Sequence, residues 1–140
     1  MSLSASSRTP RTPAPRVLVV DDDGLMRSLL ETVFTTAGFE VQLFASGTEL
    51  LAHAELRTWA LLLLDVKMPG MSGPELHRLL RERGCELPVI FLTGASDISI
   101  AVTAMHQGAV DFIEKPFSAQ ALVERAHKAL ADPKRQMQWR

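Results

Sequence analysis

The run Ala60-Leu61-Leu62-Leu63-Leu64 leads directly into Asp65, and this stretch decides the fold class. Its apolar residues are consecutive and show no alternation, which is typical of a strand buried on both faces of a sheet. Two further runs share this character and two weaker ones resemble it, at Val17–Val20, Val89–Leu92, Phe39–Phe44 and Val110–Ile113. We therefore expect five strands.

Apolar residues at helical spacing fill the gaps between these strands. The expected helices cover Leu25–Phe34, Gly47–Glu55, Leu76–Leu80, Ile98–Met105 and Leu122–Leu130. The segments Ser46–Glu49 and Ser72–Glu75 fit the capping-box pattern that begins a helix. Strands that alternate with helices predict an α/β domain, with a parallel sheet covered by helices on both faces.

Length and composition place this domain among globular proteins. The chain has 140 residues, 46% of them hydrophobic and 22% charged, with a formal net charge of −1. That length suits one domain, and the near-neutral charge makes the chain a poor candidate for binding nucleic acid by itself. We find no secretory signal and no apolar run near the roughly 20 residues that span a bilayer. The only cysteine, Cys85, has no partner for a disulfide, so we expect a cytoplasmic protein without membrane contact.

The ends of the chain differ from its middle. Residues 1–15 are rich in Ser, Thr, Pro and Arg and predict a flexible arm. Residues 132–140 turn basic after the last periodic segment, which suggests the start of a linker or a short tail. We expect the ordered domain to cover 16–131.

Polar side chains follow the strands at the points where they end. Asp21-Asp22-Asp23 follows the first strand, the third strand ends at Asp65 after four leucines, the fourth strand ends at Thr93, and Lys115 lies just beyond the fifth. The carboxyl ends of parallel strands lie at one edge of the sheet, where α/β proteins bind ligands. Carboxylates a few ångströms apart repel by about 4 kcal/mol per pair at an effective dielectric near 20. The cluster therefore needs a cation, and hard oxygen ligands without His or Cys favour Mg²⁺.

The same edge suits phosphoryl chemistry. The ammonium group of Lys115 and the hydroxyl of Thr93 are donors to phosphoryl oxygens. An aspartate can itself be the nucleophile and form an acyl phosphate. The four histidines, His53, His77, His106 and His127, lie on separate expected helices at no metal-ligand spacing, and we interpret them as residues of solvated helix faces.

Four segments together resemble a known family: VLVVDD, LLLLDVKMPGMSG, FLTG and GAVDFIEKPF. In this order and spacing they are similar to the receiver domain of two-component response regulators, with a CheY-like fold, and look closest to FixJ-like transcriptional regulators. The resemblance covers about Arg16 to Ala131. It implies the flavodoxin-like strand order 2-1-3-4-5, with five helices on the two faces.

The resemblance also implies roles for individual residues. Asp65 matches the phosphoacceptor, and Asp21 and Asp22 match the acidic pair that holds Mg²⁺ together with Asp65. Lys67 matches the position whose backbone carbonyl binds the metal. Thr93, Phe112 and Lys115 match the phosphoryl-binding and switch residues, and the Lys115–Pro116 bond is expected to be cis. Asp23 is a third acid to which the resemblance gives no role.

The implied function is a signalling switch and not an enzyme that turns over an external substrate. A sensor histidine kinase would donate the phosphoryl group to Asp65. Thr93 and Lys115 would then move inward, and the surface of the helix at Ile98–Met105, the strand at Val110–Ile113 and the helix at Leu122–Leu130 would repack. Such receivers dimerise or release an output domain through that surface. We expect a homodimer on phosphorylation, control of transcription, and contact with DNA only through an output domain that this chain lacks.

Two alternatives stay open from the sequence. Asp21-Asp22-Asp23-Gly24 is similar to the nucleophile motif of haloacid-dehalogenase-like phosphatases, but that assignment leaves Asp65 without a role. The second alternative is a receiver-like module that never accepts phosphate and acts only by binding partners. Phosphate release and phosphoryl uptake distinguish the three hypotheses.

Overall fold

The computed structural model describes residues 14–53, 56 and 60–131. The predicted tail and residues 1–13 of the predicted arm lie outside this part. The elements are, in chain order, β2 (Arg16–Val20), α2 (Gly24–Thr36), β3 (Glu40–Phe44), α3 (Gly47–His53), β4 (Leu61–Asp65), α4 (Gly73–Glu82), β5 (Val89–Thr93), the 3₁₀ helix η1 (Ala95–Asp97), α5 (Ile98–His106), β6 (Asp111–Glu114) and α6 (Ala119–Leu130). Strands and helices alternate as the apolar pattern predicts.

The strands form one parallel sheet of five strands in the order β3-β2-β4-β5-β6. Counted along the chain this is the order 2-1-3-4-5, so the predicted fold class is confirmed. β2 pairs with β3 on one side and with β4 on the other. The direction of the crossovers therefore reverses at β2, and the crevice beyond the carboxyl ends of β2 and β4 is the switch point where such sheets bind ligands.

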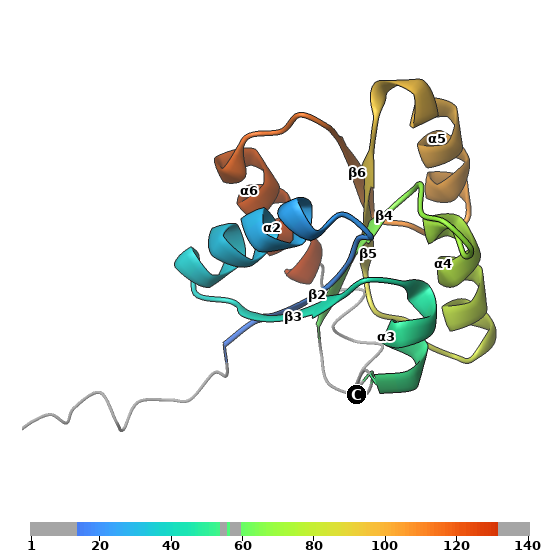
Figure 1. The fold of residues 1–140 in the computed structure, drawn as a ribbon, viewed down its shortest axis with the longest axis horizontal. Helices are drawn as coiled ribbons and strands as arrows, with labels where there is room; N and C mark the ends of the chain where they lie inside the picture. The colour runs from blue at the N-terminus through green and yellow to red at the C-terminus, as the bar shows by residue number, and fades with distance from the viewer. Residues whose placement is uncertain (1–13, 54–55, 57–59, 132–140) are drawn as a thin grey trace, which may run out of the picture.

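Helices cover both faces of the sheet (Figure 1). α2 and α6 lie on one face, and α3, α4 and α5 lie on the other. The leucine run of β4 serves both layers, since Leu61 and Leu63 pack in the core under α2 and α6 while Leu62 and Leu64 pack in the opposite core. All four side chains are fully buried. This two-sided burial is the physical reason why the run shows no alternation.

Side-chain hydrogen bonds cap the starts of α3 and α4. Ser72 and Glu75 form the predicted capping box of α4, with both reciprocal hydrogen bonds present. At α3 the Ser46 hydroxyl accepts from the Glu49 N–H, but the Glu49 carboxylate accepts from the N–H of Ala45 and not from that of Ser46. In this second capping box the Glu49 carboxylate therefore bonds Ala45, one residue earlier than the pattern implies.

Asp65 and Thr93 are the last residues of their strands, as predicted, because the ladder continues through the pairs Asp65–Leu92 and Thr93–Glu114. Other predicted boundaries differ, since β6 covers Asp111–Glu114 and not Val110–Ile113. The helix expected over Gly47–Glu55 is described as far as His53, and residues 54–55 lie outside the described part. Among the described residues, no helix has the length and apolar character needed to cross a membrane.

Candidate functional site

The predicted site residues come from the carboxyl ends of four strands. Asp21 directly follows β2, Asp65 ends β4, Thr93 ends β5, and Lys115 directly follows β6. The four strands are neighbours in the sheet. Residues that are up to 94 positions apart in sequence, such as Asp21 and Lys115, therefore converge on one edge.

Three carboxylates form a compact cluster at this edge. Asp21, Asp22 and Asp65 each offer one oxygen, and these oxygens lie within 4.8 Å of one another. Asp21 is fully buried, Asp65 is 7% exposed, and Asp22 is exposed. The cluster is thus anchored in the protein on one side and open to solvent at Asp22.

Burial makes two of these carboxyl groups harder to ionise. Burial is the largest effect on Asp21 and raises its pKa to about 6, and the neighbouring Asp65 and Asp22 act in the same direction. Burial also raises the pKa of Asp65, although the ammonium of Lys115 opposes this effect. The cluster therefore holds negative charge that the surrounding protein compensates only in part.

Lys115 places a positive charge beside this cluster. Its Nζ lies 3.1 Å from Asp65 Oδ1, and the pair is largely shielded from solvent. The Lys115 N–H donates to the carbonyl oxygen of Thr93 at 2.8 Å. Thr93 is buried, and its hydroxyl donates to the carbonyl oxygen of Gly94. The backbone thus joins the predicted lysine and hydroxyl residues directly, and the Lys115–Pro116 peptide bond is cis.

The remaining predicted residues lie around this centre. The Lys67 N–H is hydrogen-bonded to the Asp65 carboxylate, while its ammonium lies 3.7 Å from Asp97 Oδ1 in η1. Phe112 is half-buried on β6, beside Phe91 of β5. Its carbonyl oxygen accepts from Arg125 of α6, which also pairs with Asp111. Phe112 therefore lies on β6, three residues before Lys115, and its backbone contacts α6.

The donor set fits a hard divalent cation. Asp21 Oδ2 is a buried carboxylate oxygen that has no hydrogen-bond partner among the described residues. A buried carboxylate oxygen in this state is costly unless a cation compensates it. Two further carboxylates lie beside it, and oxygen-only donor sets favour Mg²⁺ over softer metals.

Sequence reasoning missed three residues that shape the site. Gly73 begins α4 so close to β4 that a Cβ atom would lie 2.3 Å from the Asp65 carbonyl oxygen. Arg27 of α2 donates from its guanidinium to the Asp21 carbonyl oxygen at 2.7 Å. Asp97 binds the Lys67 side chain, as described above. Gly73 lies in the capping-box pattern Ser72–Glu75, but that pattern does not indicate its close contact with β4. No local pattern marks Arg27 or Asp97, because Arg27 acts on a main-chain atom and Asp97 on a segment that is remote in sequence.

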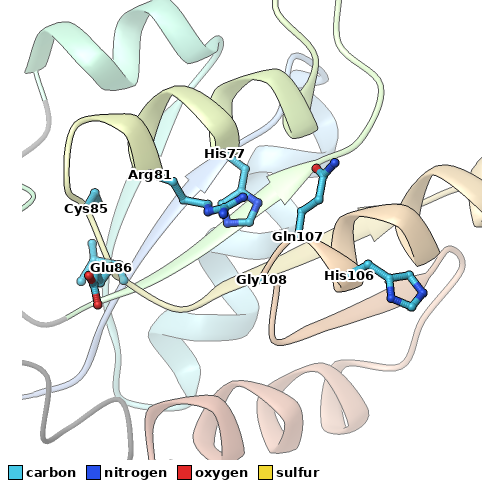
Figure 2. A pocket seen from close by; sticks show the side chains of 8 residues that line it. His77, Arg81, Cys85, Glu86, His106, Gln107 and Gly108 are labelled. Carbon is cyan, nitrogen blue, oxygen red and sulfur yellow. The ribbon is translucent and has the colours of Figure 1, made fainter.

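A pocket lies away from the acidic edge, between α4 and α5 (Figure 2). It has a volume of about 450 Å³ and is lined by His77, Arg81, Cys85, Glu86, Leu87, His106, Gln107 and Gly108. None of the predicted site residues lines it. One of its residues corrects an expectation: His77 is buried, 5% exposed, and packs edge-on against Phe91 at 5.7 Å between ring centroids. Its place on the inner side of α4, where Leu76 and Leu80 are also buried, explains why it is not part of a solvated face.

Comparison with known proteins identifies the family. Residues 17–127 match the family model of the response regulator receiver domain. The chain therefore belongs to the receiver domains of two-component response regulators, a class whose family function is phosphorylation by a kinase.

The relatives are transcriptional regulators. The C4-dicarboxylate transport transcriptional regulatory protein DctR of Rhodobacter capsulatus is 43% identical over 117 residues, which are 82% of this chain and 59% of that protein. The DNA-binding transcriptional regulator NtrC of Salmonella typhimurium is 45% identical over 113 residues, 79% of this chain and 24% of NtrC. Full-length FixJ from B. japonicum is a solved structure with a TM-score of 0.82 and 35% identity, covering 89% of this chain and 63% of that one. The chain thus spans between about a quarter and three-fifths of these relatives.

Proposed function

We propose that this receiver takes a phosphoryl group from a sensor histidine kinase onto Asp65, with Mg²⁺ held by Asp21, Asp22, Asp65 and the Lys67 carbonyl. The observation that carries this proposal is the acidic cluster itself. Among the described residues, Asp65 is the only member of the cluster that has a lysine ammonium beside it, at 3.1 Å. A nucleophilic carboxylate must be ionised, and Lys115 favours the ionised form of Asp65.

The chain's own residues then perform the transfer. One oxygen of Asp65 attacks the phosphorus atom in line, the bond from phosphorus to the donor nitrogen breaks, and the donor imidazole leaves as the acyl phosphate forms. The Lys115 ammonium stays beside the new phosphoryl oxygens and compensates their charge. A bound Mg²⁺ would neutralise charge on the phosphoryl oxygens. The protein takes part in its own modification and turns over no external substrate.

Phosphorylation would act on the output through Thr93, Phe112 and Lys115. The phosphoryl group carries about two negative charges in place of the single charge of the Asp65 carboxylate, and these attract the Thr93 hydroxyl and the Lys115 ammonium. The backbone hydrogen bond between these two residues means that β5 and β6 respond together. Phe112 would fill the space that Thr93 leaves, and the surface of α5, β6 and α6 would repack.

The same surface is the proposed homodimer contact. Ile100 and Val102 of α5 are 42% and 43% exposed, and α5 carries no charged residue between Ile98 and Met105. Burial of such apolar surface favours association. Since the relatives named above are transcriptional regulators, we propose that the output is transcription, through a DNA-binding domain outside this chain, and that the protein works in the cytoplasm.

The test is intact mass after incubation with acetyl phosphate, with and without Mg²⁺. We expect the gain of one phosphoryl group that requires the metal and is lost in Asp65→Asn. Glu114→Gln is the matched control, because it removes an exposed carboxylate at the end of β6, outside the cluster. No adduct at any Mg²⁺ concentration would favour the binding-only module. Steady phosphate release that survives in Asp65→Asn would favour the phosphatase.

A further inference from the structure

The turn between β2 and α2 closes on itself through hydrogen bonds. The Asp23 N–H donates to Asp21 Oδ1 at 2.9 Å. Asp23 Oδ1 in turn accepts from the N–H groups of Leu25 and Met26, at 2.9 and 3.4 Å. Asp23 is therefore the N-cap of α2. This arrangement gives a role to the third acid of the Asp21-Asp22-Asp23 run.

Arg27 completes the ring one helical turn later. Its N–H donates to the Asp23 carbonyl oxygen at 2.9 Å, and its guanidinium Nη1 donates to the Asp21 carbonyl oxygen at 2.7 Å. Arg27 thus connects the first turn of α2 to the backbone of Asp21, the residue that begins the acidic run.

These contacts act on backbone geometry. The guanidinium bonds a main-chain oxygen and not a carboxylate, and Asp23 directs one carboxylate oxygen to two amides of its own helix. Asp23 also lies outside the group of carboxylates that approach within 4.8 Å of one another. Between Asp21 and Asp23 stands Asp22, the exposed member of that cluster. The backbone path of the turn therefore sets the direction of the Asp22 side chain.

We propose that Asp23 and Arg27 are positioning residues that hold Asp21 and Asp22 toward Asp65, and that neither is a cation ligand. The proposal rests on the proposed function only in taking Mg²⁺ as the cation. The hydrogen bonds of the ring join protein atoms alone, so part of the test needs no cation.

The first arm measures Mg²⁺ affinity by calorimetric titration of wild type and Arg27→Met. The removal of a positive charge beside a cation site can only strengthen cation binding by electrostatics. Weaker binding must therefore come from lost geometry. We expect Arg27→Met to raise the dissociation constant roughly two- to ten-fold, the factor that one ordinary hydrogen bond provides. Equal or tighter binding would overturn the role of Arg27.

The second arm compares Asp23→Asn with Asp23→Ala. Both remove the same charge, but Asn is as good an N-cap as Asp and Ala is a poor one. The difference between the two variants therefore does not report the charge of Asp23. We expect Asp23→Ala to bind Mg²⁺ several-fold more weakly than Asp23→Asn. Equal affinities in the two variants would show that Asp23 acts through its charge or as a ligand, and would overturn its positioning role.

The third arm measures amide hydrogen exchange in the metal-free protein. The Asp23 N–H should exchange roughly two- to ten-fold faster in Arg27→Met than in wild type, because its acceptor Asp21 is no longer held. Arg78→Met is the matched control, since Arg78 lies on α4 and its charge partner is Glu82 in an exposed pair. If wild type bound no Mg²⁺, the metal in the proposed function would be wrong, while unchanged exchange at Asp23 would overturn the ring itself.

Discussion

The substitution Gly73→Ala should slow phosphorylation strongly while it lowers the free energy of unfolding only moderately. A Cβ at this residue would lie 2.3 Å from the Asp65 carbonyl oxygen, 3.1 Å from its carbonyl carbon and 3.0 Å from Phe91 Cε1. The first contact is with backbone, which no side-chain rotation relieves. In Gly73→Ala the start of α4 and the end of β4 must therefore move apart by about 1 Å to reach ordinary van der Waals distance.

Two opposing effects set the change in stability. Overpacking of this kind costs about 1–3 kcal/mol. Replacing Gly by Ala returns up to about 1 kcal/mol, because the unfolded chain loses conformational freedom. We expect a net loss of up to about 2 kcal/mol in the free energy of unfolding, measured by urea denaturation. A displacement of ~1 Å at a reacting group can lower a rate about 100-fold, so phosphorylation by acetyl phosphate should slow far more than the stability change implies.

Gly84→Ala provides the control. Gly84 has a φ of +84°, and a Cβ there would meet nothing within 4 Å. The left-handed backbone makes Ala unfavourable by roughly 1–2 kcal/mol at this position, but Gly84 follows α4 at its far end from Asp65. This variant should lose stability and keep the wild-type phosphorylation rate at 25 °C. Wild-type phosphorylation by Gly73→Ala, with unchanged stability, would refute the packing argument.

The charges of the cluster lead to three more predictions. In metal-free protein at pH 7, Asp21→Asn should raise the free energy of unfolding by about 1–3 kcal/mol. Burial raises the pKa of Asp21 to about 6, so the ionised carboxylate destabilises the folded state at pH 7 and a neutral amide does not. A loss of stability in urea denaturation would contradict this. The folded protein binds the Asp21 proton more tightly than the unfolded chain, so the wild type loses stability as pH rises from about 4 to about 6. The advantage of the Asn variant should accordingly vanish when the same denaturation is repeated near pH 4. Lys115→Met should lower the free energy of unfolding by about 1–3 kcal/mol at pH 7, because it leaves the Asp65 carboxylate without its cation. The double mutant with Asp65→Asn should recover most of that loss. Additive effects of the two substitutions would exclude a direct pair.

The fold was predictable because its central strands carry an unambiguous signal. Leu61 to Leu64 are buried on both faces, and only the middle of a parallel α/β sheet requires four such residues in a row. The edge strand β3 gave a weaker pattern, since Glu40 and Gln42 alternate with half-buried residues. Its identity followed from its place between two helices. Strand order came from the family resemblance, because periodicity does not specify which strands are neighbours.

The candidate site was predictable to the level of residue types. A carboxylate, a hydroxyl and a lysine that follow parallel strands must lie at the same edge, whatever the details of packing. Strand direction does not predict the distances between these side chains. The hydrogen bond between Lys115 and Asp65, the closeness of three carboxylates, and the burial of His77 depend on how helices pack over the sheet. Side-chain contacts between segments far apart in sequence leave no local pattern.

The sequence by itself determined the alternation of strands and helices, the edge of the sheet that carries the chemistry, and the residue types available there. These properties are local or topological, since hydrophobic period and strand direction are enough to derive them. Only the tertiary structure decided which of three consecutive acids does what. Asp21 is buried and one of its oxygens has no hydrogen-bond partner among the described residues, Asp22 faces solvent, and Asp23 caps α2. Identical side chains acquire different roles here because the path of one turn places each of them in a different environment.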